Sequence, residues 1–198
     1  MFSRYPNMTR YSVLLTAALL IACSSGEEEA EPTATPEATE APTAAPGRIF
    51  TYTGLEDCPV LESNPDEAGY FLSECKGEGG YKLRVIESDL RQTIEVVAPD
   101  GKKSDLNLSA VTGGGFSHLG KNVEWRGEVK DGAFAPDALI VRHEVVTNPE
   151  GTETESWLVA VKLAGAPCPI ARIAPGPEQN QHARDAADAG GACLAGTV

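Results

Sequence analysis

The sequence predicts an α+β domain with a mostly antiparallel sheet of about five to six strands, a C-terminal helix and two disulfides. Three features of the chain support this prediction. Several segments after residue 48 alternate apolar and polar residues with a period of two, which is typical of half-buried strands. The end of the chain has the composition and the flanking residues of a helix. Four cysteines in the same region form two candidate pairs.

The first part of the domain is expected to contribute one short strand and one hairpin. Residues 49–52 predict the short strand, and residues 54–80 predict an irregular loop because they are rich in Gly, Pro, Asn, Asp and Ser. Residues 81–87 and 91–98 both alternate, which predicts an antiparallel hairpin. The turn residues at 99–101 then end its second strand.

The middle of the domain is expected to contain a loop, a helical turn and further strands. Residues 112–115 predict the loop, and residues 116–119 predict a single helical turn that closes one end of the sheet. The further strands are expected at residues 122–129, 138–146, 156–163 and 168–174. In strand 156–163, Leu158 and Ala160 add a second apolar face. We therefore expect both faces of that strand to be covered.

The C-terminal helix is expected at residues 177–189. Pro177 suits the first helical position because its missing N–H costs nothing there, and two glycines at 190 and 191 end the helix. A stripe of small residues should let the helix approach the sheet closely; it consists of Ala183, Ala186 and Ala187.

The cysteines predict two local disulfides. An even number of cysteines is typical of disulfide-bonded domains outside the cytosol, and three pairings of these four are possible. We favour Cys58 with Cys75 and Cys168 with Cys193, because each bond closes a short loop. A zinc site is the alternative, but the sequence has neither CxxC spacing nor a nearby histidine. No cofactor is expected.

The N-terminus resembles a lipoprotein signal. Two arginines precede an apolar run of 12 residues, from Tyr11 to Ala22, which is short for a bilayer span of about 20 residues. The run ends in Leu20, Ile21, Ala22 and Cys23. This tetrad resembles the lipobox of bacterial lipoproteins, and the resemblance implies cleavage before Cys23 and acylation of its thiol and new amino group. Residue 24 is Ser, which in that family favours delivery to the outer membrane.

Three regions follow from this resemblance and from composition. Residues 1–22 are the expected signal peptide, residues 23–47 the lipidated cysteine and a tether, and residues 48–198 the folded domain. The tether consists almost entirely of Glu, Ala, Pro, Thr and Ser, so it is expected to be disordered and to hold the domain away from the membrane.

The charge of the chain disfavours nucleic acid as a partner. After residue 47 the chain has 14 Lys and Arg against 23 Asp and Glu, a net charge of −9. Nucleic acids and anionic lipids bind to clustered cations, which this composition does not provide. The expected partners are the membrane, through the lipid anchor, and an envelope protein or a cell-wall component.

Common catalytic and metal-binding motifs fail when they are tested residue by residue. His143 and Glu144 begin an HExxH-like string, but Thr147 replaces the second histidine. Ser117 and His118 lie next to each other, and neighbours in sequence seldom point at one another. With His182, the three histidines lie on different predicted elements, so no catalytic or metal residue is assigned.

The polar face of the predicted sheet carries charges of both signs. The simplest interpretation is an array of ion pairs between neighbouring strands. The alternative is a ligand patch for a carboxylate-bearing glycan or peptide, formed by Arg84, Glu124, Arg126 and Arg142. Trp125 and Trp157 lie on the more apolar side of their strands and are expected to pack in the core rather than to bind sugar.

These observations favour a non-enzymatic, lipid-anchored protein of the cell envelope that acts as a binding or structural module. Cys75, residues 77–81, residues 89–91 and residues 124–126, with the Ala-rich C-terminus, are similar to segments of exported bacterial proteins, a likeness that implies no activity. Two alternatives stay open. One is a binder of the lysozyme-inhibitor kind, since an acidic surface suits a basic enzyme. The other is a small periplasmic hydrolase that uses dispersed carboxylates and one histidine.

Overall fold

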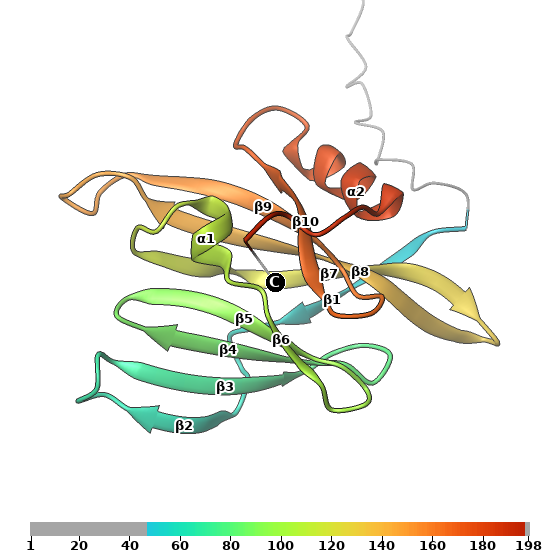
Figure 1. Cartoon of the computed structure of the whole chain (residues 1–198), viewed down its shortest axis with the longest axis horizontal. Helices are drawn as coiled ribbons and strands as arrows, with labels where there is room; N and C mark the ends of the chain where they lie inside the picture. The colour runs from blue at the N-terminus through green and yellow to red at the C-terminus, as the bar shows by residue number, and fades with distance from the viewer. Residues whose placement is uncertain (1–46, 197–198) are drawn as a thin grey trace, which may run out of the picture. The chain divides into compact units, whose positions relative to one another are not determined.

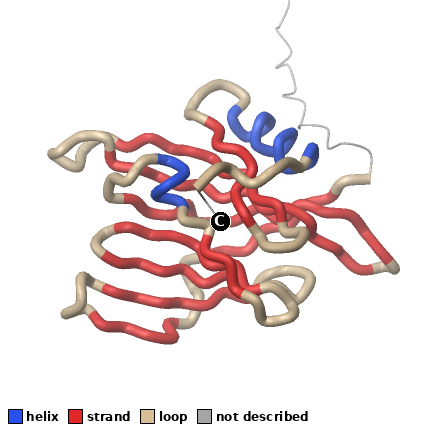
Figure 2. The backbone as a smooth tube through the Cα atoms, in the orientation of Figure 1, coloured by secondary structure: helices blue, strands red, loops and turns tan. Residues whose placement is uncertain are grey.

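The computed structural model describes residues 47–196, which fold into ten strands and two helices (Figures 1 and 2). The predicted signal peptide, Cys23 and nearly all of the predicted tether lie outside the described residues. The strands are β1 (Ile49–Gly54), β2 (Val60–Asn64), β3 (Tyr70–Lys76), β4 (Lys82–Ser88), β5 (Arg91–Val97), β6 (Lys103–Asp105), β7 (Ser117–Lys130), β8 (Ala133–Val146), β9 (Thr154–Lys162) and β10 (Cys168–Ile173). The helices are α1 (Leu108–Thr112) and α2 (Gln179–Ala189).

The strands form one sheet in the order β10-β9-β8-β7-β5-β4-β3-β2, with β1 paired to β7 and β6 paired to β5. All pairs are antiparallel except β5 with β7, which meet in parallel at Arg91 and Ser117. Beyond this contact β5 and β7 diverge. The sheet therefore consists of two halves, one with β1 and β7–β10, the other with β2–β6 (Figure 1).

The main core lies between the two halves. Alternate side chains of each strand point into it, as expected for strands with one buried face. The core contains buried residues of both halves, among them Leu83, Ile94, Val96, Val123, Trp125, Leu139 and Val141. Helix α1 adds Leu108 and Val111 to the same core.

Helix α2 covers the outer face of the first half, where it packs on β8, β9 and β10 (Figure 1). Its Ala183 and Ala187 are buried against a second apolar cluster that includes Ile140 and Leu158. The small alanines permit the close approach that the sequence predicts. Strand β9 is covered on both faces, which confirms that prediction: Leu158 faces α2 while Val159 lies in the main core.

The predicted strand number is wrong, because the sheet has ten strands rather than five to six. Residues 54–80, predicted to be an irregular loop, contain β2 and β3. Every residue of the edge strand β2 is exposed, so its sequence shows no period of burial. Its strand conformation comes from pairing with β3 instead. The short β6 was missed for a similar reason, since its three residues carry no pattern.

The predicted helical turn at residues 116–119 is also wrong, since β7 begins at Ser117 and pairs there with β8. A β-bulge in β7 makes the beginning of this strand hard to recognise from the sequence pattern. Leu119 pairs with His143 and Val123 pairs with Val141, so β7 has two more residues than β8 between these pairs. The bulge interrupts the alternation, which resumes at residue 122. The short helix that does cap the core is α1, at residues 108–112.

Both predicted disulfides are confirmed. The Cα atoms of Cys58 and Cys75 lie 4.8 Å apart, and those of Cys168 and Cys193 lie 5.6 Å apart. The first bond joins the segment before β2 to the end of β3, and the second joins β10 to the chain after α2. The C-terminal helix is confirmed as well, although it begins at Gln179 and not at Pro177.

Candidate functional site

The four residues of the predicted ligand patch lie in two separate places. Glu124 and Arg126 on β7 point away from the main core and towards α2, because their neighbour Trp125 points into that core. Arg142 on β8 faces the same side and contacts Asn180 of α2. Arg84 on β4 faces outward from the other half of the sheet, where it pairs with Glu74 and Glu95. The prediction that Arg84 belongs to the patch is therefore not supported by the fold.

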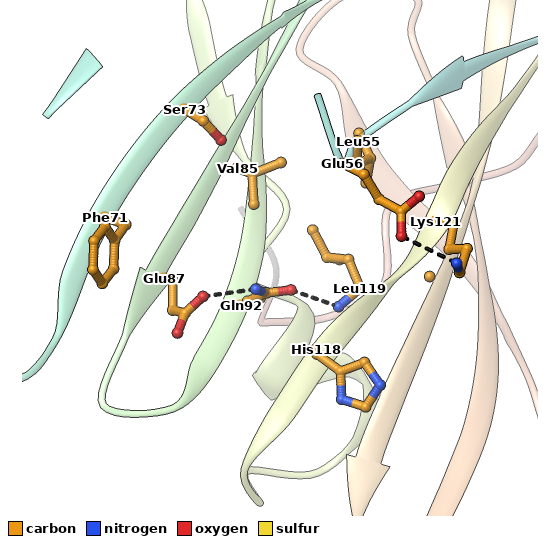
Figure 3. A pocket seen from close by; sticks show the side chains of 11 residues that line it. Leu55, Glu56, Phe71, Ser73, Val85, Glu87, Gln92, His118, Leu119 and Lys121 are labelled. Carbon is orange, nitrogen blue, oxygen red and sulfur yellow. Dashed lines mark hydrogen bonds and ion pairs between the residues drawn. The ribbon is translucent and has the colours of Figure 1, made fainter. Parts of the chain in front are cut away.

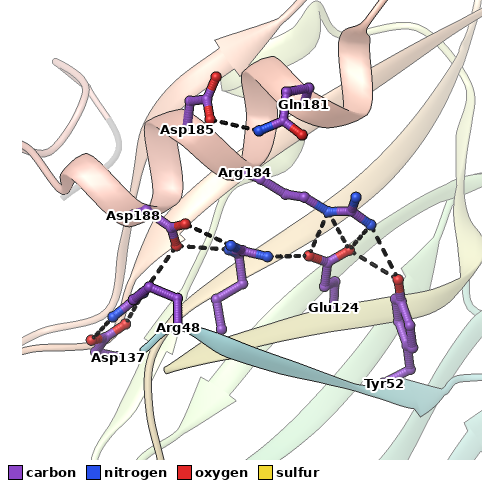
Figure 4. Close-up of polar contacts among 9 residues, drawn as sticks. Arg48, Tyr52, Glu124, Asp137, Gln181, Arg184, Asp185 and Asp188 are labelled. Atoms are coloured by element: carbon purple, nitrogen blue, oxygen red, sulfur yellow. Dashed lines mark hydrogen bonds and ion pairs between the residues drawn. The ribbon is translucent and has the colours of Figure 1, made fainter. Parts of the chain in front are cut away.

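Arg126 is the centre of a closed ion-pair network between β7 and α2. Its side chain is only 1% exposed. Its guanidinium donates to both carboxylate oxygens of Asp188, at 2.7 and 2.6 Å, and to Glu124 at 2.8 Å. Arg48 joins Asp188 to Asp137, and Arg184 donates to both oxygens of Glu124 (Figure 4). Three arginines thus balance three carboxylates.

The network holds the carboxylates of Glu124 and Asp188 in the ionised form. Burial alone would raise the pKa of Glu124, but hydrogen bonds from Arg184 and Arg126 bring it below its ordinary value. Burial likewise opposes the lowered pKa of Asp188, which the bonds from Arg126 and Arg48 produce. Such carboxylates are poor general acids near neutral pH. The arrangement is suited to holding α2 on the sheet rather than to proton transfer.

A groove of about 390 Å³ lies beside this network, between the start of α2, the outer face of β8 and the β7 bulge. We call it the helix groove. It is lined by Tyr52, Gly120, Lys121, Asn122, Glu124, Ile140, Arg142, Leu158, Asn180 and Arg184. Ile140 and Leu158 give it an apolar floor, and its volume is typical of a site for a small ligand.

Arg142 is the cation of the helix groove that has no carboxylate partner. Within residues 47–196 its guanidinium donates to the neutral side-chain oxygens of Ser156, Gln179 and Asn180 and forms no ion pair. Gly120 makes room for it: a β-carbon at Gly120 would lie 2.8 Å from the Cβ of Arg142, which is closer than packing allows. The β7 bulge therefore leaves Arg142 half-buried, positioned by neutral groups and available to an anion.

The other charges of the groove do not cancel Arg142. Glu124 is already bonded to Arg126, Arg184 and Tyr52. Lys121 pairs with Glu56 at 3.1 Å, but both side chains are largely exposed, and such surface pairs contribute only about 0–1 kcal/mol. The groove thus has a positive excess from Arg142 and Lys121.

A second groove, of about 380 Å³, opens where β5 and β7 diverge (Figure 3). We call it the seam groove. The side chain of Gln92 crosses it, accepting a hydrogen bond from the Leu119 amide at 2.8 Å and donating to Glu87 at 2.7 Å. Gln92 thereby replaces a backbone bond that the diverging strands cannot make. Phe71 and Val85 line the remaining wall.

The three histidines do not form a shared site in the structure. His143 is fully buried: its Nε2–H donates to the Gln92 carbonyl at 3.1 Å, and its Nδ1 accepts from the Thr112 hydroxyl at 2.8 Å. Burial lowers the pKa of His143, so the ring is neutral near neutral pH. His118 is exposed in the seam groove, while His182 is exposed on α2. Among the described residues no three His, Cys, Asp or Glu are grouped to hold a metal ion.

The two tryptophans differ in their burial. Trp125 is 0% exposed in the main core, as predicted, and its indole N–H donates to Thr53 at 2.9 Å. Trp157 is only half-buried, so the prediction that it packs in the core is wrong. The Arg172 guanidinium lies 4.8 Å from the centre of its ring and covers it.

Comparison with known proteins adds no relationship: no family model, curated protein or solved structure matches this chain. Across residues 47–196 neither helix has the length and apolar composition needed to cross a bilayer.

Of the residues that line the helix groove, sequence reasoning assigned only Glu124 and Arg142 to a ligand patch. It missed the others, among them Tyr52, Lys121 and Arg184. Tyr52 was assigned to a strand and Arg184 to a helix, but no local pattern shows that β1 and α2 meet on one face of β7. The signal that was present is Gly120 beside Lys121 and Asn122, because a glycine flanked by polar residues before a strand can mark a bulge.

Proposed function

We propose that this chain is a lipid-anchored, non-enzymatic protein of the cell envelope, whose domain binds a carboxylate-bearing ligand of the cell wall in the helix groove. The sequence tetrad ending in Cys23 supports the anchor, and the two disulfides agree with a location outside the cytosol. The residue after Cys23 favours the outer membrane as the site of attachment.

One observation supports the binding role above the others: Arg142 is a half-buried cation without a carboxylate partner, in a domain whose net charge is −9. An acidic domain has many carboxylates with which an arginine could pair. All three other arginines around α2 are paired in this way. Arg142 instead is held by neutral oxygens and faces a groove, as expected for a residue that binds an anion from solution.

The anchor predicts a clear effect of replacing Cys23. The wild-type chain should sediment with membranes and carry the added mass of acyl chains, because two or more chains give stable attachment at about 0.8 kcal/mol for each buried methylene. Cys23→Ser should abolish both the acyl mass and the sedimentation. Intact-mass measurement of the mature wild-type protein checks this. A mature form that starts elsewhere or lacks acyl mass would refute the anchor.

The binding role predicts a loss of affinity in Arg142→Gln. The mature protein should bind N-acetylmuramyl dipeptide, which carries a sugar ring and one peptide carboxylate, with affinity measured by calorimetry. Arg142→Gln should weaken this binding by about tenfold or more, since hydrogen bonds to charged groups contribute about 1.5–3 kcal/mol. The matched control is Arg84→Gln, which removes an arginine from the opposite face of the domain. Equal affinities in the two variants, or no binding by the wild type, would contradict the proposal.

A further inference from the structure

We infer that the ligand of the helix groove is an acidic saccharide, with a sugar ring packed on Tyr52 and its carboxylate on Arg142. This inference rests on the proposed function and narrows it, because a carboxylate on Arg142 alone fits a peptide equally well. The distinction comes from what surrounds Arg142: an exposed aromatic ring, side-chain amides and a floor with no free strand edge.

Tyr52 presents a fixed aromatic surface at the groove. Tyr52 is 49% exposed. Its hydroxyl nevertheless makes two hydrogen bonds: it donates to Glu124 at 3.1 Å and accepts from Arg184 at 3.4 Å (Figure 4). Phe50 supports it in an edge-to-face contact, with ring centres 5.7 Å apart. A tyrosine that is held at its hydroxyl loses little entropy when a ligand covers its ring. The C–H-rich face of a pyranose is a suitable partner for such a ring.

The polar groups of the groove match a sugar better than a peptide backbone. Asn122 and Asn180 are exposed at its rim, and amides both donate to and accept from sugar hydroxyls. The floor consists of β8 and β9, which are interior strands with a neighbouring strand on each side, although Arg142 lies opposite the β7 bulge and has no paired residue there. A peptide that extends a sheet needs a free strand edge, and this floor offers none. Recognition must therefore come from side chains.

The net charge of the domain limits how acidic the saccharide can be. With −9 charges outside the signal and tether, the domain repels a chain that carries a carboxylate on every sugar. The local positive excess of the groove comes from Arg142 and Lys121 only. A saccharide with one carboxylate for every two sugar rings fits this balance best, and a disaccharide of N-acetylglucosamine and N-acetylmuramic acid has this composition.

The test separates the sugar from the peptide. The mature protein is titrated with N-acetylglucosaminyl-N-acetylmuramic acid, with chitobiose as the same-sized sugar without a carboxylate, and with alanyl-glutamate as the carboxylate without a sugar. We expect the acidic disaccharide to bind at least tenfold more tightly than either of the other probes. Tyr52→Leu should weaken the binding of the acidic disaccharide about tenfold, while Tyr52→Phe, which keeps the ring, should retain most of it.

Two controls make the result decisive. Phe116→Leu removes an aromatic ring of similar exposure, 46%, that neither lines the groove nor contacts Tyr52, so it should leave affinity unchanged. Thermal unfolding of each variant shows that the fold is retained. Wild-type affinity in Tyr52→Leu, or binding of alanyl-glutamate in preference to the disaccharide, would overturn the saccharide inference and leave the proposed function in place. Failure of all three probes and of muramyl dipeptide would overturn both.

Discussion

Replacing Arg126 by Met is expected to lower the free energy of unfolding by about 3–5 kcal/mol. The side chain is 1% exposed and donates three hydrogen bonds to the carboxylates of Asp188 and Glu124. Met fills a similar volume but cannot donate, so the buried carboxylate of Glu124 and the half-buried carboxylate of Asp188 lose their main shared partner. Arg48 and Arg184 still contact these carboxylates, which places the expected loss near the lower end of the range. Urea unfolding of the two proteins measures it.

The pH dependence of this loss identifies its cause. The pKa values of Glu124 and Asp188 lie below their ordinary values in the folded state, so their ion pairs stabilise the fold above those values and lose this effect as pH falls. In Arg126→Met the same carboxylates become easier to protonate. The difference in stability between wild type and variant should therefore narrow as pH falls below the ordinary pKa values of 4.5 for Glu124 and 3.8 for Asp188. A difference that stays constant would mean that lost packing, not charge, is responsible.

Arg84→Met is the matched control for this experiment. Arg84 also bridges two carboxylates, Glu74 and Glu95, but its side chain is 21% exposed on the outer face of β4. Surface ion pairs of this kind contribute about 0–1 kcal/mol. A loss in Arg84→Met as large as that in Arg126→Met would show that burial of the network at α2 does not set its energy.

The two arginines show how far the sequence can predict this site. Alternation along a strand indicates which side chains leave the core, and it identified Arg84, Glu124, Arg126 and Arg142 correctly in that sense. It does not indicate to which half of the sheet each of these residues belongs. Arg84 belongs to the half of the sheet that lies across the core, so the four form no single patch. The partner Asp188 lies 62 residues away in sequence, and only the docking of α2 brings it to Arg126.

The fold shows the same division between local and tertiary information. Local patterns in the sequence predicted the hairpin β4–β5, strands β8–β10 and helix α2. Burial on one face gives a strand its alternation, and the residues typical of helix ends mark the two ends of α2. The edge strand β2 has no buried residue and therefore no pattern. The start of β7 was hidden by its bulge. The bulge that obscured the strand is also the feature that shapes the helix groove, since Gly120 lies there against Arg142.

Replacing Trp125 by Ala should also destabilise the domain strongly, by about 3–5 kcal/mol. Trp125 is 0% exposed and lies between the two halves of the sheet, with the Tyr81 ring centre 6.0 Å from its own. The backbone of Gly77 packs directly on the indole, since a β-carbon there would lie 2.5 Å from the ring. Truncation would leave a cavity that this backbone cannot readily fill, and would remove the N–H donor from Thr53.

The two tryptophans allow this prediction to be separated from a general effect of losing an indole. Trp157 is half-buried on β9 and covered on one side by Arg172, so Trp157→Ala should cost about 1–2 kcal/mol in the same urea unfolding measurement. Trp125→Phe should fall between the two, because it keeps an aromatic ring in the core but loses the bond to Thr53. Equal losses for Trp125→Ala and Trp157→Ala would contradict the view that the two sheet halves are held together at Trp125. The expected order instead follows burial, because the cost of truncation depends on the cavity that the surrounding backbone leaves open.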